Sequence, residues 1–439
     1  MPYLSFESKH RRTLKLLAST ALILSVFQVY AVNVAGLFVP LSLIASLLLA
    51  FYVDWKVVLK ARVILLILAL YSIQLSSLVW SPDKVMGMRE VLFELPFAMA
   101  FGLGYTLVWR YRVASLSQPM QLYVIAAAVQ SVLVIYFRLA PDAEQSFWAG
   151  RLAPLAINPN ALFALFSEAG KNNVLDPDKA GGMILNGNVA GAWASLCFFI
   201  TVALRWRRWF IVGMAIGAVH LGAVIASGSK ASLALVACAI AVAFQMRYLA
   251  RRMSVANRLM LMVAIVGAAS ALYLMTTVLL SGSDFAYESA KTLDVREIMW
   301  RHALAEFQVH PLLGHGFGGW GISFFGIGGA SGASDLYPPH NAIVYLWSQS
   351  GLLAAVLGIA IILSYLRAFE RASKCVQGWE YPLLGAGCIA VAAQSLGENY
   401  GVFGDVHASV AMGLILGAAV ASSARSKVTG RLGVSHERT

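Results

Sequence analysis

Long apolar runs separated by short basic clusters are the feature that most constrains what this sequence can fold into. Residues 14–52 are almost continuously apolar, and similar runs recur along the chain. Hydrophobic residues make up 59% of the 439 positions and charged residues 12%, whereas a soluble domain carries about 25% charge. A run of about 20 apolar residues can cross a bilayer. The sequence therefore predicts an all-α polytopic membrane protein and excludes a soluble enzyme or a disulfide scaffold.

The apolar runs divide into twelve predicted transmembrane spans. Residues 14–52 are too long for one helix across a core of about 30 Å, so we divide them at 33–36 into a helical hairpin. The other predicted spans are 61–80, 90–109, 116–137, 183–204, 208–227, 229–246, 259–281, 341–366, 381–400 and 405–424. Residues 1–439 thus form a single transmembrane domain with both termini on one side.

Basic residues gather on one side of this map. That side holds 23 of the 33 Lys and Arg residues but only 5 of the 21 Asp and Glu residues. Cytoplasmic loops are enriched in positive charge, so we expect both termini in the cytoplasm. The net charge of +12 then reflects membrane topology and contact with membrane lipids, and we expect no nucleic-acid partner. The pattern leaves the oligomeric state open.

Two segments on the other side are long, 138–182 and 282–340. Long loops carry function more often than short ones, so we expect the chemistry outside the cytoplasm, with the catalytic motif in the second loop. The sequence has no P-loop and no dinucleotide fingerprint, and we expect no cofactor. Neither loop contains any of the four cysteines, so we expect no periplasmic disulfide; these are Cys197, Cys238, Cys375 and Cys388.

The second long loop contains a predicted amphipathic helix, Leu293–His310. Asp294 and Glu297 have the spacing of a capping box at its start. Arg296 and Trp300 are four residues apart and share one face, with Arg301 one step round the helix. This pattern is typical of a phosphate-binding face, and equally of a surface helix that rests on the membrane with Trp300 as its anchor.

Two further positions fall where loops meet predicted spans. The prolines Pro338 and Pro339 restrict the backbone before His340, which we expect at the mouth of the membrane domain. A histidine there can serve as a general base or as a structural residue. Lys230 lies in a tight turn, 227–230, where its ammonium group can bind a phosphate at headgroup depth or extend to lipid headgroups.

Taken together, these segments resemble the O-antigen ligase and polymerase superfamily. The resemblance rests on residues 295–304, 310–316, 340–346 and 350–353, and on the turn 227–233, where Lys230 replaces an arginine common in the family. It implies a membrane-embedded glycosyltransferase of the C type in the bacterial inner membrane. Such ligases transfer O-antigen glycan from undecaprenyl pyrophosphate to lipid A-core at the periplasmic face. The family's essential histidine maps to His340 and its loop arginine to Arg296.

The residue types fit this chemistry. We expect Arg296, Lys230 and Arg301 to hold the pyrophosphate, because cations stabilise the charge that develops on a leaving group. We expect His340 to accept the proton of the acceptor hydroxyl in an inverting, metal-independent displacement. The cations next to His340 should disfavour its protonated form.

Other polar residues remain candidates. Trp300, Asn341, Glu398 and Asp405 are possible contacts for the acceptor or for sugar hydroxyls. Glu398 and Asp405 flank a predicted short turn and could instead act as the base, or be solvated loop charges.

Three apparent metal or buried-polar motifs favour structural readings. Asp176 and Asp178 have a metal-binding spacing, but a turn is favoured because no carboxylate cluster accompanies them. His220 is expected to be a buried helix-packing residue. Three loop histidines cross a helix end without a cysteine nearby, so zinc is not favoured; they are His302, His310 and His315.

Several functions stay open at this stage. Within the transferases, an O-antigen polymerase or a protein O-oligosaccharyltransferase would use the same residue types as a ligase. A transporter or flippase of lipid-linked glycans would use the cations for recognition alone, and it would place ionisable groups near span centres. The predicted spans are nearly free of such groups at their centres, which favours surface chemistry.

Overall fold

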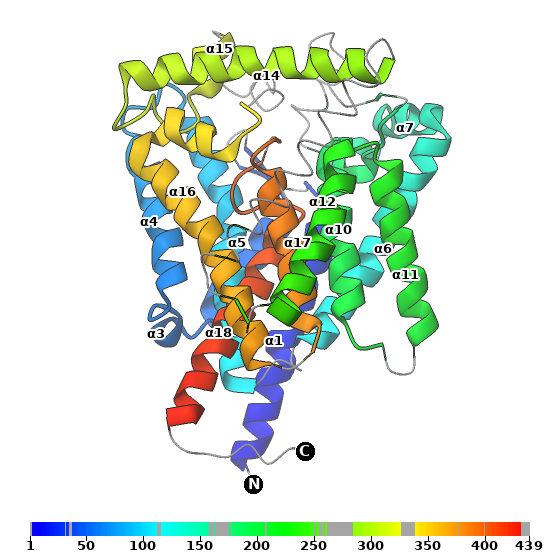
Figure 1. Cartoon of the computed structure of the whole chain (residues 1–439), viewed down its shortest axis with the longest axis vertical. Coiled ribbons are helices and arrows are strands. Elements are labelled where there is room, and N and C mark those ends of the chain that lie inside the picture. Colours follow the sequence, from blue (N-terminus) through cyan, green and yellow to red (C-terminus); the bar gives the residue numbers. More distant parts are fainter. Residues whose placement is uncertain are drawn as a thin grey trace.

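The computed structural model is mostly helical (Figure 1), which confirms the predicted all-α class. It describes residues 2–30, 32–34, 37–111, 116–157, 162, 175–176, 178–206, 209–249, 252–253, 257, 260, 284–325, 339–376, 378–398 and 400–431.

The elements follow the apolar runs in chain order. The α-helices are α1 (Pro2–Phe27), α2 (Leu41–Leu49), α3 (Trp55–Val58), α4 (Arg62–Ser77), α5 (Lys84–Tyr111), α6 (Ser117–Leu139), α7 (Pro141–Trp148), α8 (Ala153–Ala156), α10 (Gly187–Ala203), α11 (Phe210–Ala226), α12 (Lys230–Phe244), α14 (Asp284–Val309), α15 (Trp320–Phe325), α16 (Ala342–Cys375), α17 (Glu380–Gln394) and α18 (Ser409–Arg431). Short helical turns are η1 (Ala50–Tyr52), η4 (Gly182–Ile184) and η5 (Gln245–Leu249), and the two strands are β1 (Val32–Val34) and β2 (Leu37–Val39).

Within the described residues, a helix occupies each predicted span; the span at 259–281 lies outside them. By length and composition, α5, α6, α16, α18 and the stretch from α12 into η5 can each cross a membrane. The number of crossings, twelve, stays a prediction. The first predicted hairpin is joined differently from expectation, since an antiparallel ribbon of β1 and β2 pairs Asn33 with Phe38 between α1 and α2.

The span predicted at 381–400 is too long, because α17 ends at Gln394 and α18 begins only at Ser409. Glycines at 397, 401 and 404 interrupt the apolar pattern, and Gly404 has a φ of +80° that only glycine adopts readily. The carboxylate of Asp405 then accepts the backbone N–H of Ala408 just before α18 begins. The segment 395–408 is therefore a loop inserted between two helices.

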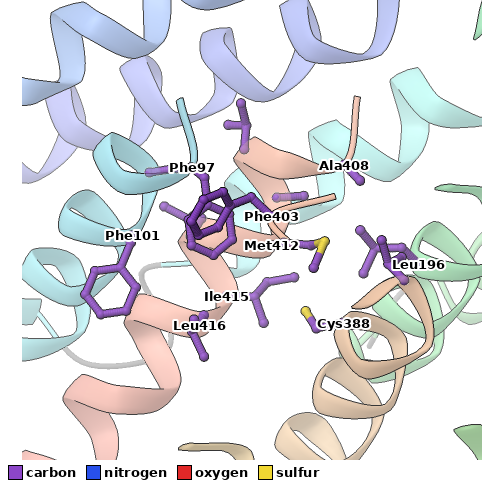
Figure 2. Close-up of a cluster of buried hydrophobic side chains, with 14 of the residues drawn as sticks. Phe97, Phe101, Leu196, Cys388, Phe403, Ala408, Met412, Ile415 and Leu416 are labelled. Atoms are coloured by element: carbon purple, nitrogen blue, oxygen red, sulfur yellow. The ribbon is translucent and has the colours of Figure 1, made fainter. Parts of the chain in front are cut away.

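Helices α5 and α18 form the centre of the core. A side chain at Gly413 or Gly417 would clash with the carbonyl oxygen of Phe97 or Phe101, respectively, so small residues allow the two backbones to approach closely. Figure 2 shows Phe403 of the loop 395–408 inserted beside Phe97, with ring centroids 4.7 Å apart. This buried ring anchors the loop to the core.

Helix α16 is kinked where a glycine-rich loop, residues 314–319, packs against it. Gly351 has φ +84° and ψ 179°, which leaves carbonyl groups of the preceding turn without helical partners. The backbone N–H of His315 donates to Ser348 (2.7 Å), and that of Gly316 donates to Gln349 (2.8 Å). The glycine-rich loop thus satisfies the kink and is held against the membrane domain.

Helix α14 lies across one end of the bundle, and the first turn of α1 and the last turn of α18 lie at the opposite end (Figure 1). The helix is longer than predicted, since it begins at Asp284 instead of Leu293. The residues 284–293 include no glycine or proline to stop the helix. Position 294 therefore lies inside the helix and not at its start, and Glu297 pairs with Arg301 one turn later.

Candidate functional site

A cavity of about 330 Å³ lies where α5, the start of α16 and the loop 395–408 meet. Four of the predicted site residues line this cavity. His340 and Asn341 line it from the start of α16, and Glu398 and Asp405 line it from the loop. The structure thus brings together predicted site residues that are up to 65 positions apart in the chain.

His340 is held rigidly at the cavity wall. Its side chain is buried, and its backbone adopts a φ of +47°, a conformation uncommon for residues other than glycine. Asn341 follows as the N-cap of α16 and accepts the backbone N–H groups of Ile343 and Val344. The indole N–H of Trp300 donates to the carbonyl of Pro339 (2.7 Å), which ties α14 to this segment. His340 thus lies just before α16, in the wall of the cavity.

Glu398 lies between the arginine of α14 and the histidine of α16. Its Oε1 accepts a hydrogen bond from Nη2 of Arg296 at 3.1 Å, and its Oε2 is 3.8 Å from Nδ1 of His340. Both Glu398 and His340 are only 4% exposed, so their charges interact with little screening. Neither Nδ1 of His340 nor Nε of Arg296 has a hydrogen-bond partner among the described residues.

This arrangement corrects the expected surroundings of His340. We expected cations beside it, but the charged group that faces the imidazole is the carboxylate of Glu398, with Arg296 on the far side. The prediction that Arg296 and Trp300 share one face is confirmed, since both contact segments next to the cavity.

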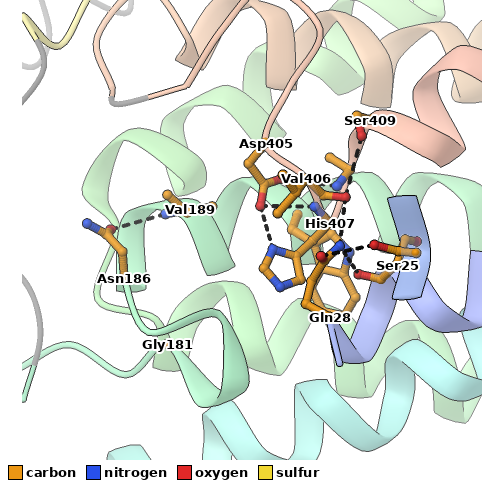
Figure 3. Close-up of polar contacts among 12 residues, drawn as sticks. Ser25, Gln28, Gly181, Asn186, Val189, Asp405, Val406, His407 and Ser409 are labelled. Atoms are coloured by element: carbon orange, nitrogen blue, oxygen red, sulfur yellow. Dashed lines mark hydrogen bonds and ion pairs between the residues drawn. The ribbon is translucent and has the colours of Figure 1, made fainter. Parts of the chain in front are cut away.

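Asp405 is engaged in the structure of the loop. Its Oδ2 contacts Nδ1 of His407 at 2.7 Å, and its Oδ1 accepts the N–H of Ala408 (Figure 3). Gln28, directly after α1, donates to the carbonyl of Val406, which fixes the same segment from the other side. The contacts of Asp405 are therefore those of a residue that shapes the loop before α18.

Two predicted cations lie apart from this wall. Arg301 is exposed on α14 and forms an i,i+4 ion pair with Glu297 at 2.5 Å. Lys230 is the first residue of α12, in an exposed position after the N-cap Ser229. Neither is among the described residues that line the cavity. A hydrogen bond from Ser232 to Gln394 (3.0 Å) connects the turn of Lys230 to the start of the loop 395–408.

Three other motifs make contacts within the fold. Asp176 accepts the N–H of Asp178 (2.9 Å), which is a turn contact, and Asp178 forms an ion pair with Arg138 (3.2 Å). His220 packs in α11 and contacts Ser131 at 2.8 Å. Burial lowers the pKa of His302, whose Nε2 is 2.6 Å from the hydroxyl of Ser323.

Sequence reasoning missed the part of the wall that α5 provides. Glu90 and Glu94 line the cavity one helical turn apart, and Tyr345 donates to Glu90 at 2.5 Å. The signal was present, because both carboxylates fall inside the span predicted at 90–109, where an ionisable residue marks a functional site by default. Tyr400 lines the same cavity, and nothing in the sequence singled it out.

Part of this chain matches a known protein family. Residues 215–359 match the family model described as O-antigen ligase. That segment contains Lys230, Arg296 and His340, whereas Glu398 lies beyond it. A comparison of the whole chain with curated proteins gave no match. The segment 215–359, which carries Arg296 and His340, is therefore similar to the O-antigen ligase family.

Proposed function

We propose that this protein transfers O-antigen glycan from undecaprenyl pyrophosphate to lipid A-core oligosaccharide, at the periplasmic face of the bacterial inner membrane. The observation that carries the proposal is the Arg296–Glu398–His340 arrangement at the wall of a cavity next to α14. The family match supports a glycan transfer of the ligase or polymerase type. Among these we prefer the ligase.

In this proposal His340 is the general base. The acceptor hydroxyl gives its proton to Nε2 of His340 while its oxygen bonds to the anomeric carbon. The bond to the pyrophosphate oxygen breaks on the opposite face, so the configuration inverts and undecaprenyl pyrophosphate leaves. Glu398 faces the other ring nitrogen at 3.8 Å, on the side of the ring away from the acceptor hydroxyl.

Arg296 serves two groups in the proposed mechanism. One of its nitrogens holds Glu398, and its remaining N–H groups can bind an oxygen of the pyrophosphate. The buried Nε, which has no partner among the described residues, is consistent with such a ligand. Lys230 and Arg301 would hold the donor further from the reacting carbon, and the cationic groups replace a metal ion in neutralising the leaving group.

Reconstitution with a purified lipid-linked glycan tests the reaction. The enzyme is offered lipid A-core, free glycan or protein as acceptor, with and without excess chelator. Transfer to lipid A-core in chelator is the expected result. Transfer to glycan would instead identify a polymerase, transfer to protein an oligosaccharyltransferase, and movement of the lipid-linked glycan without any transfer a flippase. Activity that needs magnesium or manganese would contradict the metal-independent mechanism.

Substitutions at His340 and Glu398 test the mechanism. His340→Gln and His340→Asn keep a hydrogen-bonding group, and asparagine also tolerates the positive φ. Both should lower turnover by roughly 10²–10⁴ and leave donor binding intact. Glu398→Gln should lower turnover and change its pH profile, because the protonated imidazole loses its carboxylate partner.

The comparison of these variants separates two roles. If His340→Gln keeps most of the turnover, His340 is a binding residue and the base lies elsewhere. Arg296→Lys should restore little of the activity lost in Arg296→Ala, since a point charge does not replace a planar fork of donors. Donor binding measured on Arg296→Ala separates loss of the pyrophosphate contact from loss of the Glu398 contact.

A further inference from the structure

The α5 side of the cavity has a different chemical character from the side of Arg296. Glu90 and Glu94 line it, with Phe93 between them and Arg89 alongside. Residues four apart on a helix share one face, so the two carboxylates are directed to the same space. Two carboxyl groups and the Phe93 ring offer hydrogen bonds and apolar contact to a hydroxylated ligand. This wall therefore suits an uncharged part of a substrate.

The groups that face these carboxylates are typical of a sugar-binding site. Tyr345 donates to Oε2 of Glu90 at 2.5 Å and thereby fixes the orientation of that carboxylate. Tyr400 lines the cavity and is only 9% exposed, yet its hydroxyl has no hydrogen-bond partner among the described residues. Buried hydroxyls normally have a partner, so a ligand hydroxyl is the missing one. Carboxylates accept hydrogen bonds from hydroxyl groups, and aromatic rings pack against the apolar face of a sugar.

The wall lies next to His340, and this position favours the acceptor as the substrate whose sugar binds there. Tyr345 follows His340 by little more than one turn at the start of α16, and both line the same cavity. A ring held by Glu90, Glu94 and Tyr400 would present a hydroxyl to the imidazole. The cavity, about 330 Å³, is at the small end of ligand pockets, which run from roughly 300 to 1,000 Å³. It suits the terminal part of an oligosaccharide better than a long glycan.

We propose that Glu90, Glu94 and Tyr400 form the subsite for the acceptor sugar, an uncharged polyhydroxylated ring whose hydroxyl attacks the donor. This inference rests on the proposed function, and it assigns binding to a face of α5 that lies outside the segment matched by the family model.

The test measures acceptor and donor saturation separately, in the reconstituted enzyme with lipid A-core as acceptor. Glu94→Gln and Tyr400→Phe should each raise the acceptor KM by about tenfold or more, since each loses a hydrogen bond to a substrate hydroxyl in a buried site. The donor KM should stay within about twofold. Glu370→Gln is the matched control, because it makes the same substitution at an ion pair with Lys374 in the distant half of α16.

Each outcome decides the assignment. A raised donor KM with an unchanged acceptor KM would overturn it, since the wall would then bind the donor glycan. Unchanged KM values for both substrates would also overturn it. Tyr400→Phe removes a single oxygen and keeps the ring, so it gives a result even if Glu94→Gln does not fold. Direct binding of delipidated core oligosaccharide to wild type and Tyr400→Phe gives the same comparison without turnover. If wild type transfers glycan to no acceptor, the proposed function fails, independently of the subsite.

Discussion

At the scale of single residues, the carboxylate of Glu398 gives the site its electrostatic character. It is buried between a guanidinium on α14 and an imidazole on α16, so one side chain couples two elements that approach the cavity separately. The guanidinium of Arg296 contacts the carboxylate of Glu398, and that carboxylate faces the imidazole of His340. The surroundings of the proposed base therefore depend on Glu398.

A second buried carboxylate makes the stability of the protein depend on pH. Glu144 of α7 is 2% exposed, and burial raises its pKa from 4.5 to about 7, with Asp176 adding to the effect and the N–H of Gly181 opposing it. The folded state thus holds a proton that the unfolded state releases. The stability that this proton contributes is complete below about pH 4.5 and is lost as pH rises through 7.

Glu144→Gln should remove this dependence. The amide oxygen can still accept the Gly181 N–H, and it carries no charge to bury. We expect the variant to have a higher Tm than wild type at pH 8, by roughly 2–4 °C, and a similar Tm at pH 5. Thermal unfolding in detergent at both pH values measures this. The exposed Glu297→Gln serves as control, and an equal Tm difference at both pH values would contradict the assigned pKa.

At the scale of elements, the kink in α16 positions the beginning of that helix, next to the cavity. The N–H groups of the glycine-rich loop bond to carbonyls freed at the kink, and Phe317 of the same loop donates its N–H to Ser77 of α4. Helix α16 begins at Ala342, two residues after His340. Its first turns are therefore joined to α4 and to the segment that follows α14. A straight α16 would lose these contacts.

Gly351→Ala should destabilise the protein because the kink requires glycine. Its φ and ψ fall in a region that costs other residues on the order of 1–3 kcal/mol, and an added methyl group would clash with the carbonyl of Leu312. We expect a lower Tm and a smaller yield of monodisperse protein. Gly217→Ala in α11 is the control, since its methyl group would make an ordinary contact with Thr201 at 3.7 Å. Equal behaviour of the two variants would show that the kink is not needed.

At the scale of the whole molecule, the two ends of the helical bundle differ in the elements that they carry. Helix α14 crosses one end of the bundle, and the beginning of α1 and the end of α18 lie at the other (Figure 1). On the predicted map most basic residues fall on the side of the termini, so by the positive-inside rule we expect that end in the cytoplasm. The cavity and α14 would then face the periplasm, where a donor on undecaprenyl pyrophosphate is presented.

Thiol labelling tests this orientation with a natural reporter. Cys375 is exposed at the end of α16, and Gln308 is exposed on α14. In cells with a permeabilised outer membrane, an impermeant thiol reagent should leave Cys375 unlabelled until the inner membrane is breached. Gln308→Cys, made with Cys375 and Cys238 replaced by serine, should be labelled at once. Labelling in the reverse order would invert the topology.

The sequence by itself determined the helical class, the location of most helices and the candidates His340 and Arg296. These follow from local properties: apolar length, prolines before a helix, and residues that share a helix face. Where local signals competed, prediction was less accurate, as at the loop 395–408, whose glycines lie within an apolar run. Only the tertiary structure decided that Glu398 joins Arg296, 102 positions away, and that Glu90 and Glu94 face the same cavity as Tyr400. Such contacts depend on how α5, α16 and α18 pack, because residues far apart in the chain meet only when close backbone approach and a kink bring their helices together.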